Sequence, residues 1–252
     1  MGINAELSLE SVDQREQEYV QNHFERYSEI WRIVERTVQP PARILEVGTL
    51  FGHIAVYLQY MGYQVCTTDI EEEAAIYRNR LAKHHGILEY VCDLNTENLP
   101  LPDNYFDLVL FTEVLEHINP STAQKAVSEI SRVLRPGGYL LLGTPNVFNL
   151  GSRLRMMLGH KFLCLEHIRE YSLGEVKALI NGENLFRASG GQAYPKSKVE
   201  SRLRITEEWY SLVLDWIKYG PWKMRVARKL LLPFKLIYPR FRTQIFILAV
   251  KT

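Results

Sequence analysis

Two short segments carry residue types that could remove a proton from a hydroxyl group. The first, "FTEVLEHI", holds Glu113, Glu116 and His117, and the second, "LEHIREYS", holds Glu166 followed by His167. A histidine or a carboxylate near its ordinary pKa can act as a general base on a phenol or sugar hydroxyl. We therefore take His117 and His167 as the catalytic candidates.

These two histidines are distant in sequence, and the expected topology brings them together. His117 lies just past an apolar strand-like run, "YFDLVLFTEVL", at the end of a strand where ligands usually sit. His167 begins a segment that must fold back over the same edge. We expect the two imidazoles to lie within about 10 Å of each other, since two ligands of one ion each sit about 2 Å from it.

A second chemical feature is the loop in "ILEVGTLFGHIAVYL", residues 44–58. Gly48 and Gly52 flank three residues between an apolar strand pattern and a helix pattern. A glycine after a strand lets the chain turn and lets a ligand approach the backbone closely. A dinucleotide fingerprint needs three glycines to seat a pyrophosphate, and this loop has two. The loop alone could also be an ordinary strand-to-helix turn.

The loop belongs to a series of alternating elements. We expect a first helix at 12–38, then strands at 42–48, 63–69, 87–94, 105–115 and 139–146, with helices at 53–62, 71–86 and 119–138 between them, the last capped by Asn119. Such alternation predicts a doubly wound, parallel α/β sheet with its ligands beyond the carboxyl ends of the strands. Acids occupy several of those ends, and they suit a hydroxyl-rich, cationic ligand: Glu46, Asp69, Asp93 and Glu113.

The alternation fails after residue 146. We divide the chain into an N-terminal helical segment at 1–40, a core at 41–146, a basic helical cap or insertion at 147–243, and a final strand at 244–252. Charge follows this division, because residues 1–186 carry a net −9 and residues 187–252 a net +10. A basic region of this size indicates an anionic partner.

The segment 209–242 has two interpretations. Five apolar residues share one helical face at its start: Trp209, Leu212, Val213, Trp216 and Ile217. Lysines and arginines follow among large apolar residues, which is typical of a helix lying in a membrane interface. The alternative is a cap helix that packs on the sheet and points its lysines at water. No RNA-binding signature is present, so nucleic acid is not expected as a partner.

The remaining composition excludes several classes of protein. No apolar stretch is long enough to span a bilayer, and the N-terminus has no secretory h-region. Three scattered cysteines form no disulfide framework and no zinc spacing. The expected location is the cytoplasm. Peripheral contact with a membrane surface through residues 209–242 is an alternative that the sequence leaves open.

Taken together, "ILEVGTLFGHIAVYL", "LPDNYFDLVLFTEVLEHI" and "LRPGGYLLLGTPN" resemble the class I S-adenosylmethionine-dependent methyltransferases over residues 42–146. The first stretch is similar to that family's motif E/D-x-G-x-G-x-G, except that Leu50 replaces the middle glycine and should narrow the loop. The resemblance implies a Rossmann-like, mostly parallel seven-stranded sheet with a helical cap before its last strand. It also implies S-adenosylmethionine as the cofactor.

The resemblance further implies roles for residues along the strand ends. Asp69 would accept both ribose hydroxyls, Ile70 would pack on the adenine, and Asp93 with the Leu94 backbone N–H would bind the adenine edge. The loop backbone would face the methionyl tail, whose end Thr112 and Glu113 would close. The complete predicted cofactor set is Glu46, Gly48, Thr49, Gly52, Asp69, Ile70, Asp93, Leu94, Thr112 and Glu113.

A metal is a further possibility from resemblance. Glu-x-x-Glu-His with a distant histidine is similar to the metal site of small-RNA 2′-O-methyltransferases, and a related cluster occurs in some ubiquinone-pathway O-methyltransferases. Carried over, the ligands of a magnesium-type ion would be Glu113, Glu116, His117 and His167. Such an ion would lower the pKa of acceptor hydroxyls. Relatives without a metal carry a similar sequence after the fourth strand, so a histidine acting as a base without an ion is the favoured alternative.

The function that follows is methyl transfer, more to oxygen than to nitrogen, on a small-molecule, lipid-linked or glycan acceptor. An RNA 2′-O-methyltransferase is the alternative among enzymes. A methyltransferase-like module that binds a partner without catalysis is the alternative from another class, because Leu50 departs from the glycine motif.

Overall fold

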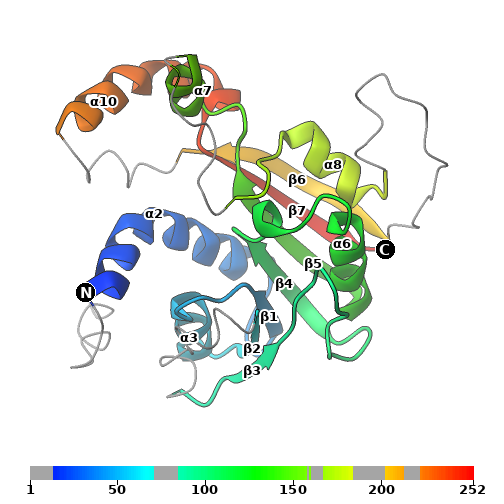
Figure 1. The fold of residues 1–252 in the computed structure, drawn as a ribbon. Helices are drawn as coiled ribbons and strands as arrows, with labels where there is room; N and C mark the ends of the chain where they lie inside the picture. Colours follow the sequence, from blue (N-terminus) through cyan, green and yellow to red (C-terminus); the bar gives the residue numbers. More distant parts are fainter. Residues whose placement is uncertain (1–13, 71–84, 158, 160–166, 184–201, 213–221) are drawn as a thin grey trace.

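The structure is a computed structural model that describes residues 14–70, 85–157, 159, 167–183, 202–212 and 222–252. Its centre is a seven-stranded sheet in the order β3-β2-β1-β4-β5-β7-β6 (Figure 1). The strands are β1 (Arg43–Val47), β2 (Gln64–Asp69), β3 (Leu88–Val91), β4 (Phe106–Thr112), β5 (Leu134–Pro145), β6 (Leu203–Ser211) and β7 (Gln244–Lys251). The strands β1 to β5 pair in parallel, and β7 runs antiparallel to both neighbours. The predicted doubly wound, mostly parallel fold is confirmed.

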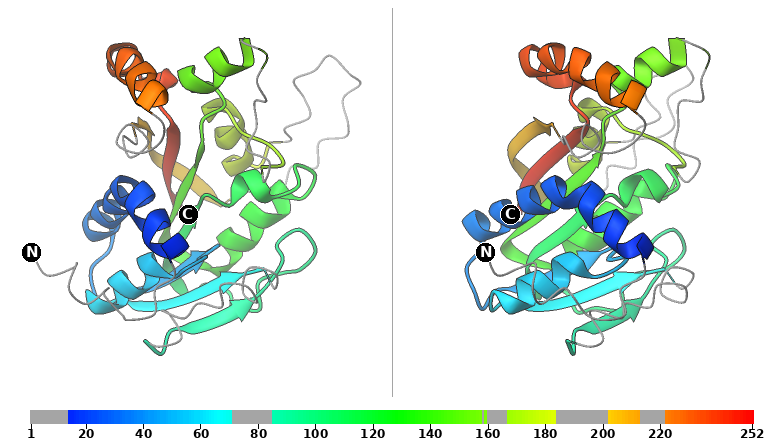
Figure 2. Two further views of the ribbon diagram at one scale, coloured as in Figure 1. Left: turned by 60° about the vertical axis from the view of Figure 1, so that its left-hand side comes forward. Right: turned by 90° about the vertical axis from the view of Figure 1, so that its left-hand side faces the viewer.

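Helices cover both faces of this sheet (Figures 1 and 2). The helices are α2 (Gln14–Thr37), α3 (His53–Tyr60), α6 (Ala123–Val133), α7 (Leu150–Met157), α8 (Leu173–Ile180) and α10 (Trp222–Ile237), with 3-10 turns η1 (Leu115–His117) and η3 (Pro239–Phe241). Leu108 and Leu110 of β4 pack with α2 and α3, and Val109 and Phe111 pack with α6 and α8. Because neighbouring strand residues face opposite sides, a strand buried on both faces must be apolar throughout.

The expected cap at 147–243 is wrong in one respect. Residues 203–211 form β6, which pairs antiparallel with β7 and so belongs to the sheet. The helical face proposed from Trp209 is therefore also wrong there, because Trp209 lies in a strand and stacks on Phe246 of β7. Val213, Trp216 and Ile217 lie outside the described residues.

The α8 helix packs into the main core rather than forming part of a separate cap. Val176, Leu179 and Ile180 are buried in the same cluster as residues of α6. Among the helices that the structure describes, α7 and α10 stand away from the sheet, beyond the carboxyl ends of its parallel strands (Figure 1). In the part of the chain that the structure describes, no helix is both long and apolar enough to cross a bilayer.

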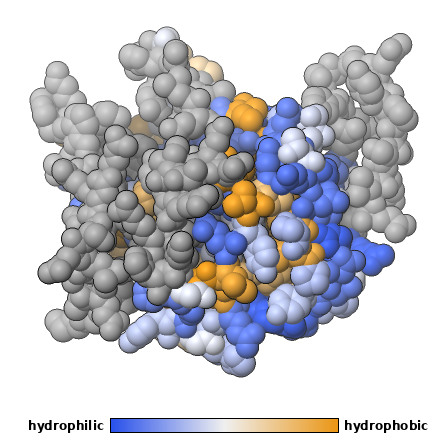
Figure 3. All heavy atoms as spheres, turned by 60° about the horizontal axis from the view of Figure 1, so that its bottom comes forward, coloured by the Kyte–Doolittle hydropathy of each residue, from blue (hydrophilic) through white to orange (hydrophobic). Residues whose placement is uncertain are grey.

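The boundaries of the helix expected at 119–138 differ from expectation, because the regular α6 helix begins at Ala123 and ends at Val133, where β5 follows directly. Asn119 still has the contacts of a helix cap in the turn before α6. Its Oδ1 accepts the backbone N–H and the hydroxyl of Ser121, and its carbonyl oxygen accepts the backbone N–H of Ala123. The helix expected at 71–86 lies, except for its last two residues, outside the described residues. Seen from below, the part of the surface that the structure describes is mostly hydrophilic, with hydrophobic side chains interspersed (Figure 3).

Candidate active site

The loop after β1 has the backbone of a glycine-rich turn. Gly48, Leu50 and Gly52 all have positive φ, at 73°, 48° and 77°. A side chain on Gly48 would not fit, because an added Cβ would lie 2.3 Å from Cγ2 of Val114. Leu50 thus adopts a left-handed conformation that glycine takes more easily, at a cost of about 1 kcal/mol. The expectation that Leu50 narrows the loop stays a prediction.

Asp69 closes this loop from the end of β2. One of its carboxylate oxygens accepts the backbone N–H of Leu50 at 2.8 Å, and the other accepts that of Ile70 at 2.9 Å. Burial raises the pKa of Asp69, and these backbone N–H groups act against that rise. Each oxygen keeps a further lone pair for a ligand. Asp69 thus holds the backbone of the loop, and its predicted role at the ribose hydroxyls stays a prediction.

Glu46 supports the loop from inside. Its side chain is buried, and its Oε2 accepts the Thr49 hydroxyl at 2.9 Å. Burial raises the pKa of Glu46 to about 8. A carboxyl that is protonated at neutral pH avoids the cost of burying an unpaired charge. Glu46 and Thr49 therefore shape the turn, and a direct contact with a cofactor is not required for this role.

Asp93 lies in the turn after β3. Its Oδ1 accepts both the backbone and the side-chain N–H of Asn95 at 2.9 Å. Leu94 beside it is buried. This Asx turn occupies part of the carboxylate, so its adenine-binding role stays a prediction.

Glu113 follows β4 in a strained conformation, with φ at 58°. Its Oε2 is 2.6 Å from Nη1 of Arg26 and 3.3 Å from Nε2 of Gln244. Its Oε1 is buried and has no hydrogen-bond partner among the described residues. Neither Arg26 nor Gln244 was predicted as a site residue. The sequence could have pointed to Arg26, because it is a cation among the apolar residues of the expected first helix. A charge on a buried helix face needs a partner of opposite charge.

Glu116 is the most deeply buried acid of the site. Its Oε2 accepts the Thr144 hydroxyl of β5 at 3.0 Å, and its Oε1 has no partner among the described residues. Burial, followed by the nearby Glu113 carboxylate, raises the pKa of Glu116 well above its usual range. The backbone carbonyl of Glu116 accepts the N–H groups of Ile168 and Arg169 at 2.9 and 3.1 Å. These two bonds bring the segment after residue 166 back to the site.

As a result, His117 and His167 meet edge to face, with ring centroids 5.1 Å apart. The predicted convergence of the two histidines is confirmed. The Nδ1 of His167 also lies 3.4 Å from Oε1 of Glu170, without a hydrogen bond. Glu116, His117 and His167 each offer one potential ligand atom, and these atoms lie within 4.8 Å of one another.

Glu113 is not part of that cluster. The predicted four-ligand set is therefore wrong at Glu113, whose carboxylate is held by Arg26 instead. Thr112 is buried at the end of β4, as expected of a strand-end residue beside the site. Glu166 lies outside the described residues.

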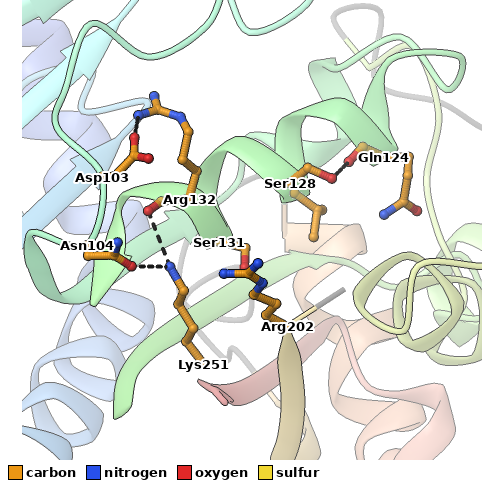
Figure 4. Close-up of a pocket in the computed structure, with 9 residues that line it drawn as sticks. Asp103, Asn104, Gln124, Ser128, Ser131, Arg132, Arg202 and Lys251 are labelled. Atoms are coloured by element: carbon orange, nitrogen blue, oxygen red, sulfur yellow. Dashed lines mark hydrogen bonds and ion pairs between the residues drawn. The ribbon is translucent and has the colours of Figure 1, made fainter. Parts of the chain in front are cut away.

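Two hollows lie elsewhere on the molecule. One, of about 290 Å³, lies between α6 and the end of β7, where Lys251 donates to Asn104 and to the carbonyl oxygen of Arg132 (Figure 4). The other is an open groove of about 1020 Å³ between α2 and β6, lined in part by Phe24, Glu29 and Trp209. None of the predicted site residues lines either hollow.

Comparison with known proteins agrees with this geometry. Residues 45–142 match the family described as "Methyltransferase domain". The chain is 31% identical over 121 residues to a ubiquinone/menaquinone biosynthesis C-methyltransferase of Cupriavidus metallidurans, covering 46% of this chain and 49% of that protein. It is 27% identical over 146 residues to an uncharacterized methyltransferase of Bacillus subtilis, covering 57% and 56%. The chain thus spans about half the length of these curated relatives.

Solved structures share the fold over most of the chain. A S-adenosylmethionine-dependent methyltransferase from Archaeoglobus fulgidus superposes with a TM-score of 0.61 at 16% identity, covering 95% of this chain and 100% of that one. An N-methyltransferase from Bradyrhizobium japonicum, solved with S-adenosyl-L-homocysteine, has a TM-score of 0.55 at 13% identity, covering 91% and 87%.

Proposed function

Residues 45–142 of this chain form a class I S-adenosylmethionine-dependent methyltransferase domain, and from that premise we propose that the protein methylates a small acceptor that must lose a proton. The observation that supports this proposal most is the meeting of His117 and His167 beside the buried Glu116. The cluster lies at the carboxyl edge of the sheet, which is the edge that carries the glycine loop and Asp69.

The residues present fit the cofactor. S-adenosylmethionine, when bound, supplies an electrophilic methyl group. Asp69 would bind the ribose hydroxyls with its remaining lone pairs, with Ile70 against the adenine and Asp93 with Leu94 at the adenine edge. The backbone of 48–52 would face the methionyl part. The unpartnered Oε1 of Glu113, which follows Thr112 at the end of β4, is a buried acceptor that suits a cationic amine.

The two histidines supply the proton chemistry. An imidazole that is neutral near pH 7 can take the proton of a phenol or other hydroxyl as the oxygen attacks. Much of the remaining task is positioning, because methyl transfer is an in-line displacement. The Glu116 carbonyl, which binds the backbone of Ile168 and Arg169, holds His167 in place for this step.

The same base can activate more than one atom of the acceptor. We propose transfer to oxygen. The relative from Cupriavidus metallidurans is named as a C-methyltransferase, and removal of a phenolic proton also makes the ring carbons beside that oxygen more nucleophilic. One base can therefore activate either the oxygen or a neighbouring ring carbon as the acceptor of the methyl group. The RNA 2′-O-methyltransferase and the non-catalytic module are not favoured by the comparisons.

A divalent ion is the alternative to the bare base. Glu116, His117 and His167 together could hold one, and mixed Glu/His ligands do not single out a hard ion such as magnesium. We favour the bare base, because the fourth predicted ligand, Glu113, pairs with Arg26.

The test combines cofactor binding and acceptor screening with one variant, His167→Ala. Isothermal calorimetry with S-adenosylmethionine and S-adenosyl-L-homocysteine measures cofactor binding, and labelled cofactor with phenolic, lipid and glycan acceptors identifies the substrate class. Mass spectrometry and NMR of the product identify the methylated atom. We expect His167→Ala to lower kcat about 100-fold or more while cofactor affinity stays unchanged.

Two results would contradict this scheme. Absence of cofactor binding by the folded protein at millimolar concentration would remove the methyltransferase function. Activity that is abolished by exhaustive chelation and restored by magnesium would replace the bare base with an ion.

A further inference from the structure

The helices α7 and α10 form a surface unlike the rest of the molecule. They contact each other and stand clear of the sheet, beyond the carboxyl ends of its parallel strands (Figures 1 and 2). Large apolar side chains are exposed on both, with Leu230 and Ile237 each 69% exposed and Met157 79% exposed. Met156, Phe234 and Leu236 are exposed as well. We call this the α7–α10 surface.

The charge of α7, and of α10 with the turn that follows it, has one sign. Residues 150–157 contain two arginines, residues 222–243 contain seven lysines and arginines, five of them within α10, and neither range contains an aspartate or glutamate. Exposed Lys229 and Arg240 belong to this set. Helices whose charges are all positive and whose exposed side chains are largely apolar suit a partner that is anionic at its surface and apolar beneath.

The position of the surface connects it with the active site. The Asn146 side chain, at the end of β5, donates to the backbone carbonyls of Arg240 and Arg242 at 2.8 and 2.9 Å. The chain that follows α10 is thereby fixed to the edge of the sheet where His117 and His167 meet.

We propose that the α7–α10 surface docks on an anionic lipid surface and that the acceptor reaches the active site from that surface. The second half of this proposal, an amphiphilic acceptor, rests on the proposed methyltransferase function. The first half does not. Each exposed leucine or phenylalanine leaves water on docking, and each lysine or arginine lies against anionic headgroups.

Other occupants fit less well. A second copy of the chain would bring two cationic surfaces of the same sign together. Single-stranded RNA would match the charge, and the exposed side chains are mainly leucine, isoleucine and methionine rather than the aromatic residues on which bases stack. Lipid uses both the cations and the aliphatic side chains, so it accounts for the whole surface.

Co-sedimentation with vesicles tests the proposal directly. The probes are vesicles of phosphatidylcholine alone and vesicles of phosphatidylcholine with phosphatidylglycerol, without cofactor or acceptor. We expect the wild type to sediment with the anionic vesicles and to be released by salt. Leu230→Ser and Lys229→Glu should each weaken this binding about tenfold.

Matched variants outside the surface provide the controls. Leu88→Ser removes a leucine of β3 that is 66% exposed, and Arg204→Glu reverses an exposed cation of β6 opposite Val250, near the end of β7. Both variants should bind vesicles within about twofold of the wild type, because neither Leu88 nor Arg204 belongs to the α7–α10 surface.

Four outcomes would overturn the proposal. Wild type that stays in the supernatant means that no lipid docks on the α7–α10 surface. Equal losses in Leu88→Ser and Leu230→Ser mean non-specific adsorption. A dimer in light scattering that Leu230→Ser dissociates assigns the surface to a second copy. Tighter binding to mixed-sequence RNA, unaffected by Leu230→Ser, assigns it to nucleic acid.

The result is separable from the proposed function. Calorimetry with S-adenosylmethionine on the same preparations reports the cofactor site alone. Cofactor binding without vesicle binding removes the lipid surface and leaves the methyltransferase function standing. Vesicle binding without cofactor binding removes the methyltransferase function, and the amphiphilic acceptor with it, and leaves the lipid surface standing.

Discussion

Arg26 Nη1 lies 2.6 Å from Glu113 Oε2, which joins the N-terminal helix α2 to the loop after β4 across 87 residues of chain. Both side chains are largely buried, and the Arg26 charge is also close to the Tyr19 hydroxyl. The pair therefore makes α2 part of the active-site wall. It also removes Glu113 from the cluster of possible metal ligands.

The Arg26–Glu113 pair should matter for stability. Arg26→Ala leaves a mostly buried carboxylate without its cation, so we expect the free energy of unfolding to fall by about 3 kcal/mol. Arg36→Ala is the control, because its ion pair with Glu207 is exposed and should contribute less than about 1 kcal/mol. Urea denaturation of both variants measures the difference. Equal effects would mean that the buried pair contributes no more than a surface pair.

The Asp69 carboxylate should determine cofactor affinity. Asp69→Ala removes an acceptor that the ribose hydroxyls would use, and we expect binding of S-adenosylmethionine to weaken by about 2–3 kcal/mol. Asp69→Asn keeps one acceptor oxygen and should lose less. Calorimetry gives both affinities, and circular dichroism checks that each variant is folded, because Asp69 also holds the backbone N–H of Leu50. Unchanged affinity in Asp69→Ala would exclude this ribose-binding role.

The two left-handed positions of the loop should respond oppositely to substitution. Leu50→Gly relieves the positive φ, so stability should hold or rise by up to about 1 kcal/mol, with cofactor binding retained. Gly48→Ala forces a Cβ against Val114 at φ 73° and should destabilise the fold by about 2 kcal/mol or more. Thermal unfolding and calorimetry measure both. Loss of cofactor binding in folded Leu50→Gly would show that the leucine side chain makes a needed contact.

The raised pKa of Glu46, about 8, predicts a specific pH dependence of stability. Between the unfolded value of 4.5 and about 8, the folded state holds the proton more tightly than the unfolded state, so stability falls as pH rises. The stability that the folded protein gains from the Glu46 proton is complete below about pH 4.5 and lost above about pH 8. Glu46→Gln cannot ionise, so its stability relative to the wild type should increase by roughly 3 kcal/mol between pH 5 and pH 8.5. A constant difference across this range would mean that Glu46 ionises normally in the folded protein.

Much of this site was predictable from local sequence. The apolar runs of β1 and β4, the glycines that flank Leu50, and the acids at the strand ends each depend on neighbours within a few residues. Parallel topology then requires those ends to share one edge. This rule is also why His117 and His167 could be expected to meet.

Tertiary structure decided the rest. The stretch from Leu203 to Ser211 is polar enough to read as part of a cap, and it forms a strand because β7 offers a free edge whose backbone groups must be paired. Glu113 became the partner of Arg26 rather than a ligand beside Glu116, because a buried cation on α2 needs a carboxylate and no local pattern shows which one. The sequence by itself determined which elements form and which residues stand at their ends. The pairing of charges between distant elements, and the helices left without a sheet to cover, depended on how those elements pack.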